Sequence, residues 1–130
     1  MTSLAAATLY TGLFLFLFAI LKLNCGRVRI GTKVNYGQGG NEKMIQAMRV
    51  QGNAIEDGPI VLIGLFGLAS LSAPTLLIHV IGSVFFVSRV LHAIGLGSGD
   101  GSGAPRLIGT IGSLLSLLVT GGSCLWFVLS

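Results

Sequence analysis

Three polar residues in one segment have the types and spacing to bind a charged ligand. Arg49, Asn53 and Glu56 are separated by four and three residues, so on a helix they share one face within about 60°. A guanidinium, an amide and a carboxylate together complement a ligand that carries carboxylates and an ammonium group. Asp57 lies on the flank of this face. The pattern predicts a polar pocket for a zwitterionic or anionic ligand; the alternative, which can coexist with it, is an ion-pair network in which Glu56 binds an arginine.

Arg89 and His92 form a second polar pair farther along the chain. Their spacing of three residues places both on one helix face. Arg89 could neutralise Glu56, whereas His92 could bind a ligand, act as a catalyst, or be satisfied by backbone or water. His79 lies ten residues before Arg89, and we interpret it as structural. No Cys, His and carboxylate residues have metal-site spacing, and no serine has the partners of a catalytic triad.

Arg106 is the third candidate, and it directly follows Pro105. Proline is favoured in the first turn of a helix, so Arg106 should lie near a helix N-terminus. A guanidinium held there would favour an anion or a thiolate. The alternative is an anchor whose charged end reaches the membrane surface.

The composition indicates what kind of protein must position these residues. Only 9% of the 130 residues are charged, 52% are hydrophobic, and the mean hydropathy is +0.88. A soluble domain carries about 25% charged residues, so most of this surface cannot face water. The chain is therefore expected to be an all-α membrane protein, with no nucleic-acid partner because aromatics are not interleaved with its basic residues. Cys25 and Cys124 are expected to be free thiols at opposite membrane faces.

Four apolar segments are long enough to cross a hydrocarbon core about 30 Å thick. We expect one domain over residues 1–130, folded as a four-transmembrane-helix bundle. The predicted helices span about residues 3–23, 41–71, 75–96 and 105–129. Asn41 is a suitable N-cap for the second helix, and Pro59 should bend that helix. In the last helix, a stripe of small residues suits close helix packing: Gly112, Ser116 and Thr120.

The positive charges predict the topology. Residues 24–40 form a basic, glycine-rich connection after the first apolar segment. Positively charged loops tend to stay in the cytoplasm, so we expect this connection and the 97–104 loop there, and both termini on the outer side. Because positive charge follows the first apolar run instead of preceding it, we expect a retained helix and no signal peptide.

Taken together, these features resemble the MAPEG family, the membrane-associated proteins of eicosanoid and glutathione metabolism. The resemblance rests on four short helices, on Arg-x3-Asn-x2-Glu at residues 49–56 and on Arg-x2-His at residues 89–92. It covers nearly the whole chain. It is closest to small bacterial members, which share Tyr-Gly-x-Gly-Gly, here residues 36–40, and Gly-Asn-Ala-x-Glu, here residues 52–56.

The resemblance implies a homotrimer that binds glutathione between neighbouring subunits, towards the cytoplasm. By this resemblance the glutathione-binding residues are Arg49, Asn53, Glu56, Arg89 and His92. Arg106 would be the catalytic residue that stabilises the glutathione thiolate. The sequence departs from the family at Leu96, where many family enzymes have a tyrosine, so one glutathione contact is missing.

We therefore expect a glutathione transferase or peroxidase of a bacterial inner membrane. Glutathione would be the co-substrate, and the second substrate would be a hydrophobic electrophile or peroxide that reaches the site from the bilayer. Two alternatives remain, a small proton-coupled multidrug exporter and a non-catalytic scaffold that binds glutathione or lipid. The position of Glu56 among arginines argues against the exporter, which would need a lone carboxylate at mid-membrane.

Overall fold

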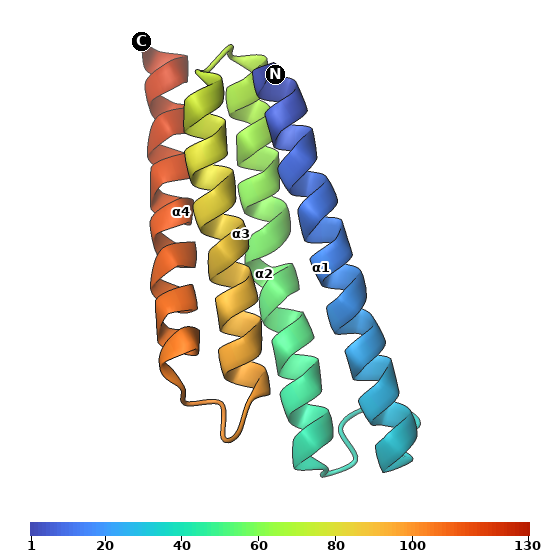
Figure 1. The fold of residues 1–130 in the computed structure, drawn as a ribbon. Coiled ribbons are helices and arrows are strands. Elements are labelled where there is room, and N and C mark those ends of the chain that lie inside the picture. The colour runs from blue at the N-terminus through green and yellow to red at the C-terminus, as the bar shows by residue number, and fades with distance from the viewer.

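The protein folds as four helices with no strands, in a computed structural model that describes all of residues 1–130. The helices are α1 (Ser3–Thr32), α2 (Glu42–Ser70), α3 (Thr75–Gly97) and α4 (Ala104–Leu129). They run up and down side by side, with both termini at one end of the bundle (Figure 1). All four are long and apolar enough to cross a membrane. The predicted fold class, an all-α membrane protein with a four-helix bundle, is confirmed.

The helices α2 and α3 form the centre of the bundle. Helix α1 packs against α2 and α3, and α4 packs against the same two helices, whereas α1 and α4 do not touch. The α1 and α4 helices therefore lie on opposite sides of the α2–α3 pair. The bundle consequently presents an α2–α4 face and, away from it, an α1–α3 face.

Large apolar side chains between α1, α2 and α3 make up the core. Phe85 is 2% exposed and stacks on Phe14 with ring centroids 6.0 Å apart. Gly58 of α2 leaves the room that the Phe14 ring occupies, and Gly82 of α3 does the same for the Tyr10 ring. Close helix approach through small residues lets a membrane bundle pack without a hydrophobic driving force between its helices.

Helix α1 is longer than the sequence analysis predicted. It ends at Thr32, so the expected boundary at residue 23 is wrong, and residues 24–32 of the predicted connection are helical. Hydropathy marks where a helix leaves the bilayer, not where it ends, and basic residues are good helix formers. The helix stops where Lys33 adopts the left-handed conformation with φ of 57°, and Arg29 donates hydrogen bonds to the carbonyls of Val34 and Gly37.

The predicted signals at the other helix ends are present. The Asn41 side chain accepts a hydrogen bond from the Met44 N–H at 3.1 Å and caps α2. Pro59 lies inside α2, which continues past it to Ser70. Pro105 lies in the first turn of α4.

The stripe of small residues on α4 packs inward as expected. Ser116 and Thr120 are buried. Gly112 leaves room for the side chain of Ser88 on α3, and Thr120 fills the space beside Gly64 of α2. The stripe thus holds α4 against both central helices.

Candidate functional site

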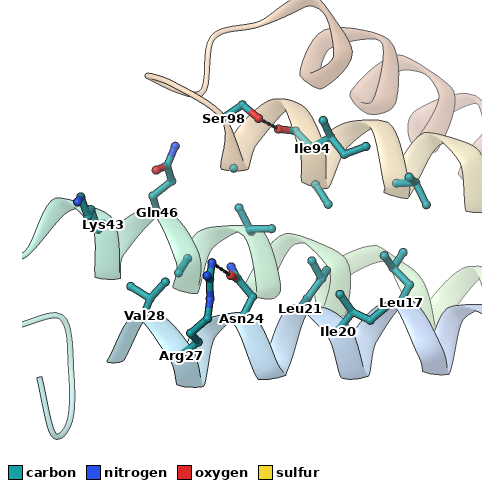
Figure 2. A pocket seen from close by; sticks show the side chains of 15 residues that line it. Leu17, Ile20, Leu21, Asn24, Arg27, Val28, Lys43, Gln46, Ile94 and Ser98 are labelled. Carbon is teal, nitrogen blue, oxygen red and sulfur yellow. Dashed lines mark hydrogen bonds between the residues drawn. The ribbon is translucent and has the colours of Figure 1, made fainter. Parts of the chain in front are cut away.

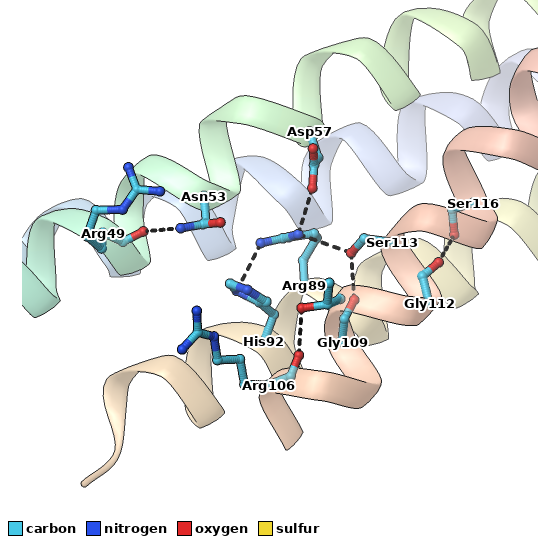
Figure 3. Close-up of polar contacts among 11 residues, drawn as sticks. Arg49, Asn53, Asp57, Arg89, His92, Arg106, Gly109, Gly112, Ser113 and Ser116 are labelled. Atoms are coloured by element: carbon cyan, nitrogen blue, oxygen red, sulfur yellow. Dashed lines mark hydrogen bonds and ion pairs between the residues drawn. The ribbon is translucent and has the colours of Figure 1, made fainter. Parts of the chain in front are cut away.

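Polar side chains from three helices gather on the α2–α4 face, near the end of the bundle that carries the 33–41 and 98–103 loops. Arg49 and Asn53 come from α2, Arg89 and His92 from α3, and Arg106 from α4 (Figure 3). Residues that are up to 57 positions apart in the chain are therefore collected along one side of the bundle. We call this set, together with Glu56 and Asp57, the polar cluster.

Arg89 is the buried centre of the polar cluster, with its side chain only 2% exposed. Its Nη1 donates to Asp57 Oδ2 at 2.9 Å and to Ser113 Oγ at 3.0 Å. Ser113 in turn donates to the carbonyl of Gly109 at 2.8 Å. One guanidinium therefore ties α3 to both α2 and α4.

The partner of Arg89 differs from the one considered in the sequence analysis. Asp57, not Glu56, forms the ion pair. Adjacent residues on a helix point about 100° apart, so α2 turns Asp57 towards α3 while Glu56 points outward. The interpretation of Arg89 as the partner of Glu56 is wrong.

His92 lies beside Arg89, with its Nδ1 3.1 Å from the Nη2 of the arginine. Arginine can only donate hydrogen bonds. His92 Nδ1 must therefore accept, which leaves the imidazole proton on Nε2. His92 is 5% exposed, so its position is fixed by packing and by this bond.

The Nε of Arg89 has no hydrogen-bond partner although it is buried. Such an atom costs free energy unless something satisfies it. The contacts of the two Nη atoms with Asp57, Ser113 and His92 compensate for the burial of the charge.

The predicted ligand-binding set on α2 is open. Arg49 Nη1 lies 3.5 Å from Glu56 Oε1, and the two side chains are 56% and 57% exposed. Asn53 donates from Nδ2 to the carbonyl of Arg49 at 2.9 Å, so its Oδ1 remains free to accept. Gly52 lies beneath the pair, and a Cβ there would touch both partners at 4.0 Å. The two charges and the amide can therefore reach a ligand on this face.

Arg106 is held by the loop that precedes its helix. Its Nη1 donates to the carbonyl of Gly101 at 2.9 Å. Gly95 of α3 lies so close that a Cβ there would overlap the Arg106 backbone, so the α3–α4 contact fixes the height of Arg106 in the bundle.

The 98–103 loop is organised by a short turn next to Gly101. Ser102 donates to Asp100 Oδ1 from its backbone N–H at 3.0 Å and from its hydroxyl at 2.6 Å. These hydrogen bonds stabilise the carboxylate and lower the pKa of Asp100. The turn keeps the Gly101 carbonyl available to Arg106.

The contacts of Arg89 with Asp57 and Ser113 were not predicted from the sequence. A usable signal was the arginine inside an apolar helix, which requires a carboxylate and hydroxyl partners at the same depth. Leu96 is 9% exposed and belongs to the core, so this position contributes no polar side chain to the site. No group of three or more His, Cys, Asp or Glu side chains is placed to hold a metal ion.

Comparison with known proteins identifies the family of the chain. The sequence pattern of the MAPEG family matches residues 7–126, which is nearly the whole chain and includes every member of the polar cluster. The chain belongs to the MAPEG family. Membership connects this membrane protein with glutathione in general terms.

Two relatives are similar over most of their length. Inner membrane protein YecN of Escherichia coli strain K12 is 30% identical over 89 residues, which cover 68% of each chain. Uncharacterized protein sll1147 of Synechocystis sp. is 32% identical over 130 residues, covering 95% of this MAPEG chain and 89% of the relative. No solved structure matches the chain.

Proposed function

We propose that this MAPEG protein is a glutathione-dependent transferase or peroxidase whose active site is the polar cluster. The observation that carries the proposal is the open Arg49–Glu56 pair on α2, on the same face as Arg106 at the start of α4. A set of groups suited to a zwitterion and a cation that could stabilise a thiolate on one face support the proposal.

The binding step follows from charge complementarity. Glutathione carries two carboxylates and one ammonium group. Arg49 would bind a carboxylate through its guanidinium fork, Glu56 would bind the ammonium, and the free Oδ1 of Asn53 would accept from an amide N–H. Each group is on α2 and needs little rearrangement, since Arg49 and Glu56 are already more than half exposed.

The chemical step requires the glutathione thiol to lose its proton. Arg106 would stabilise the resulting thiolate, as a fixed cation does for a developing anion. In the transferase reaction the sulfur attacks an electrophilic carbon, a C–S bond forms and the leaving group departs. In the peroxidase reaction the sulfur attacks a peroxide oxygen, the O–O bond breaks, and the departing alkoxide takes up a proton and leaves as an alcohol. The glutathione sulfenic acid then reacts with a second glutathione, which forms the S–S bond of the disulfide and releases water.

Arg89 and His92 would support this site indirectly. Arg89 is buried and its Nη1 is bound to Asp57 and Ser113, so its role would be to hold α2 and α4 at a fixed separation. His92 would then present its Nε2–H from the floor between those helices.

The proposed assembly is a homotrimer, and the proposed location is the inner membrane. In a single chain, Arg49 and Glu56 pair with each other but are more than half exposed on a membrane-spanning helix, where charged side chains almost always face a bundle interior or a water-filled cavity. A homotrimer would cover them with a neighbouring chain. The name of the relative YecN supports an inner-membrane location. The basic residues of α1 and α2 near the 33–41 loop support a cytoplasmic active site at that end of the bundle.

The test is binding and turnover by the purified protein. Detergent-solubilised protein should bind immobilised glutathione and should catalyse either conjugation of a chloronitrobenzene or reduction of a lipid hydroperoxide. Arg49→Gln should lose binding, whereas Lys33→Gln, an equal charge change outside the polar cluster, should retain it. Binding without turnover would indicate the scaffold, and proton-coupled uptake in vesicles without thiol binding would indicate the exporter.

A further inference from the structure

A groove of about 600 Å³ opens on the α1–α3 face, with α2 as its floor. Figure 2 shows Leu17, Ile20 and Leu21 of α1 along one wall and Ile94 of α3 along the other. This groove lies across the α2–α3 pair from the α2–α4 face and shares no residue with the polar cluster. It is therefore separate from the proposed glutathione site.

One end of the groove is positively charged. Arg27 of α1 and Lys43 of α2 both line it, and neither forms an ion pair, because the two ion pairs of the protein are Arg49–Glu56 and Arg89–Asp57. Arg27 uses Nη2 to donate to Asn24 Oδ1 at 3.0 Å, which orients the guanidinium and leaves its other N–H groups available. Two cations from two helices therefore line one groove, and neither is paired with a carboxylate.

The hydrogen-bonded side chain of Gln46 lines the groove near this end. Gln46 Nε2 donates to the carbonyl of Leu96 at 2.8 Å and to that of Gly99 at 3.1 Å. These bonds fasten α2 to the end of α3 and hold Lys43, one turn away on α2, at the mouth of the groove.

The rest of the groove is apolar and runs into the span of the membrane. Leu17 lies ten residues before Arg27 on α1, which is about 15 Å along a helix axis. Val90 and Ile94 of α3 line the same stretch. The groove thus changes from charged to apolar along the direction in which a membrane changes from headgroup to hydrocarbon.

The depth of the charged end matches the headgroup layer. Lys22 is the first charged side chain of α1, and Arg27 follows it by about 7.5 Å along the axis. The headgroup regions extend a bilayer from about 30 Å of hydrocarbon to about 40–45 Å. Arg27 and Lys43 are therefore placed where lipid phosphates lie.

We infer that this groove binds one phospholipid with an anionic headgroup. Its phosphate would contact Arg27 and Lys43, and one acyl chain would lie along Leu17, Leu21 and Val90. A soluble phosphate would use only the charged end, whereas the apolar stretch of about 15 Å accounts for a lipid chain. Two basic groups that form no ion pair favour an anionic lipid over a zwitterionic one.

The test is lipid titration of the delipidated full-length protein, followed by native mass spectrometry. Phosphatidylglycerol should bind with one tight site per chain, more strongly than phosphatidylethanolamine and far more strongly than free glycerol phosphate. Removing the charges in Arg27→Gln/Lys43→Gln should lower phosphatidylglycerol affinity by roughly fivefold per charge. The control Lys22→Gln/Lys33→Gln removes the same charge from exposed positions outside the groove and should leave the tight site intact.

A second measurement on the unmodified chain does not depend on any variant folding. A phosphatidylglycerol that carries a photoreactive group on its acyl chain should label residues 17–21 and 90–94. Equal affinity for the two lipids, equal loss in the two double variants, equal binding of glycerol phosphate, or labelling confined to other segments would each overturn the proposal.

Discussion

Arg89 Nη1 of α3 lies 2.9 Å from Asp57 Oδ2 of α2, and the arginine side chain is only 2% exposed. Because Ser113 of α4 accepts from the same Nη1, this ion pair is the point where three membrane-spanning helices are joined. A charge so deeply buried depends on its partner, which makes the pair the most sensitive position in the bundle.

Asp57→Asn should destabilise the protein strongly. The substitution keeps the size of the side chain but leaves the buried Arg89 without its counter-charge, a change that costs about 3–5 kcal/mol. Thermal unfolding in detergent should show the loss. Adding Arg89→Leu to this variant should recover part of the stability, since the unpaired charge is then gone.

Glu56→Gln is the matched control for Asp57→Asn. Its carboxylate pairs with Arg49 at 3.5 Å, and both side chains are more than half exposed in the chain; exposed pairs contribute only about 0–1 kcal/mol. It should therefore weaken glutathione binding more than it weakens the fold. If the two variants unfolded at the same temperature, Asp57 would not be the essential partner of Arg89.

Arg106→Ala should lower the turnover rate by a factor of about 10²–10³, as is typical when one electrostatic group is removed. The variant should still bind glutathione. The guanidinium stays charged at any working pH. Without it, the ultraviolet thiolate signal of bound glutathione should fall at neutral pH and should return only at higher pH. Arg106→Lys should recover part of the activity, because a point charge cannot copy the guanidinium fork. Unchanged turnover and thiolate signal would reduce Arg106 to a membrane-surface anchor.

Gly95→Ala should disturb both the fold and the position of Arg106. The added methyl group would overlap the Arg106 backbone, and overpacking of this kind costs about 1–3 kcal/mol. Gly121→Ala is the control, because nothing lies within 4 Å of a Cβ at that position and alanine is the better helix former. Similar melting temperatures for the two variants would show that the α3–α4 contact can relax at no cost.

The purified protein should be a homotrimer. Native mass spectrometry in a mild detergent should give three times the chain mass of 13.5 kDa, since in the proposed assembly neighbouring chains would cover the exposed Arg49 and Glu56. A monomer or an antiparallel dimer would rule out a site shared between neighbouring subunits.

Reporter fusions should place Ser130 on the outer side of the membrane and the 33–41 loop in the cytoplasm. Phosphatase, which is active only outside the cytoplasm, should be active at Ser130, and a cytoplasmic reporter should be active at Gly39. The Lys and Arg residues around the first loop provide the physical reason. The reverse pattern at both positions would invert the topology.

The sequence was sufficient for the features that depend on local patterns. Apolar length located the four spans, and the N-cap Asn41 and the first-turn residue Pro105 located two helix starts, because each of these acts within a few residues. The end of α1 at Thr32 was not predictable from hydropathy, because a helix that has left the bilayer continues until its backbone turns.

Most residues of the polar cluster were predictable from the sequence, but the ion-pair partner of Arg89 was not. Spacing on one helix brought Arg49, Asn53 and Glu56 together. The choice between Asp57 and Glu56 as partner of Arg89 depends on how α2 is rotated against α3, which is set by the packing of side chains across the bundle. No spacing within one segment carries that information.

The burial of Arg89 also has a consequence for how the chain enters the membrane. An arginine at the centre of an isolated helix opposes insertion by about 2.5–3.5 kcal/mol, so α3 gains a stable place in the lipid only when its charge is neutralised. Asp57 is synthesised before Arg89, and Ser113 after it. The third span should therefore settle against an α2 that is already inserted and become locked when α4 arrives, so biogenesis would proceed as a sequential assembly in which each new helix completes the one before it.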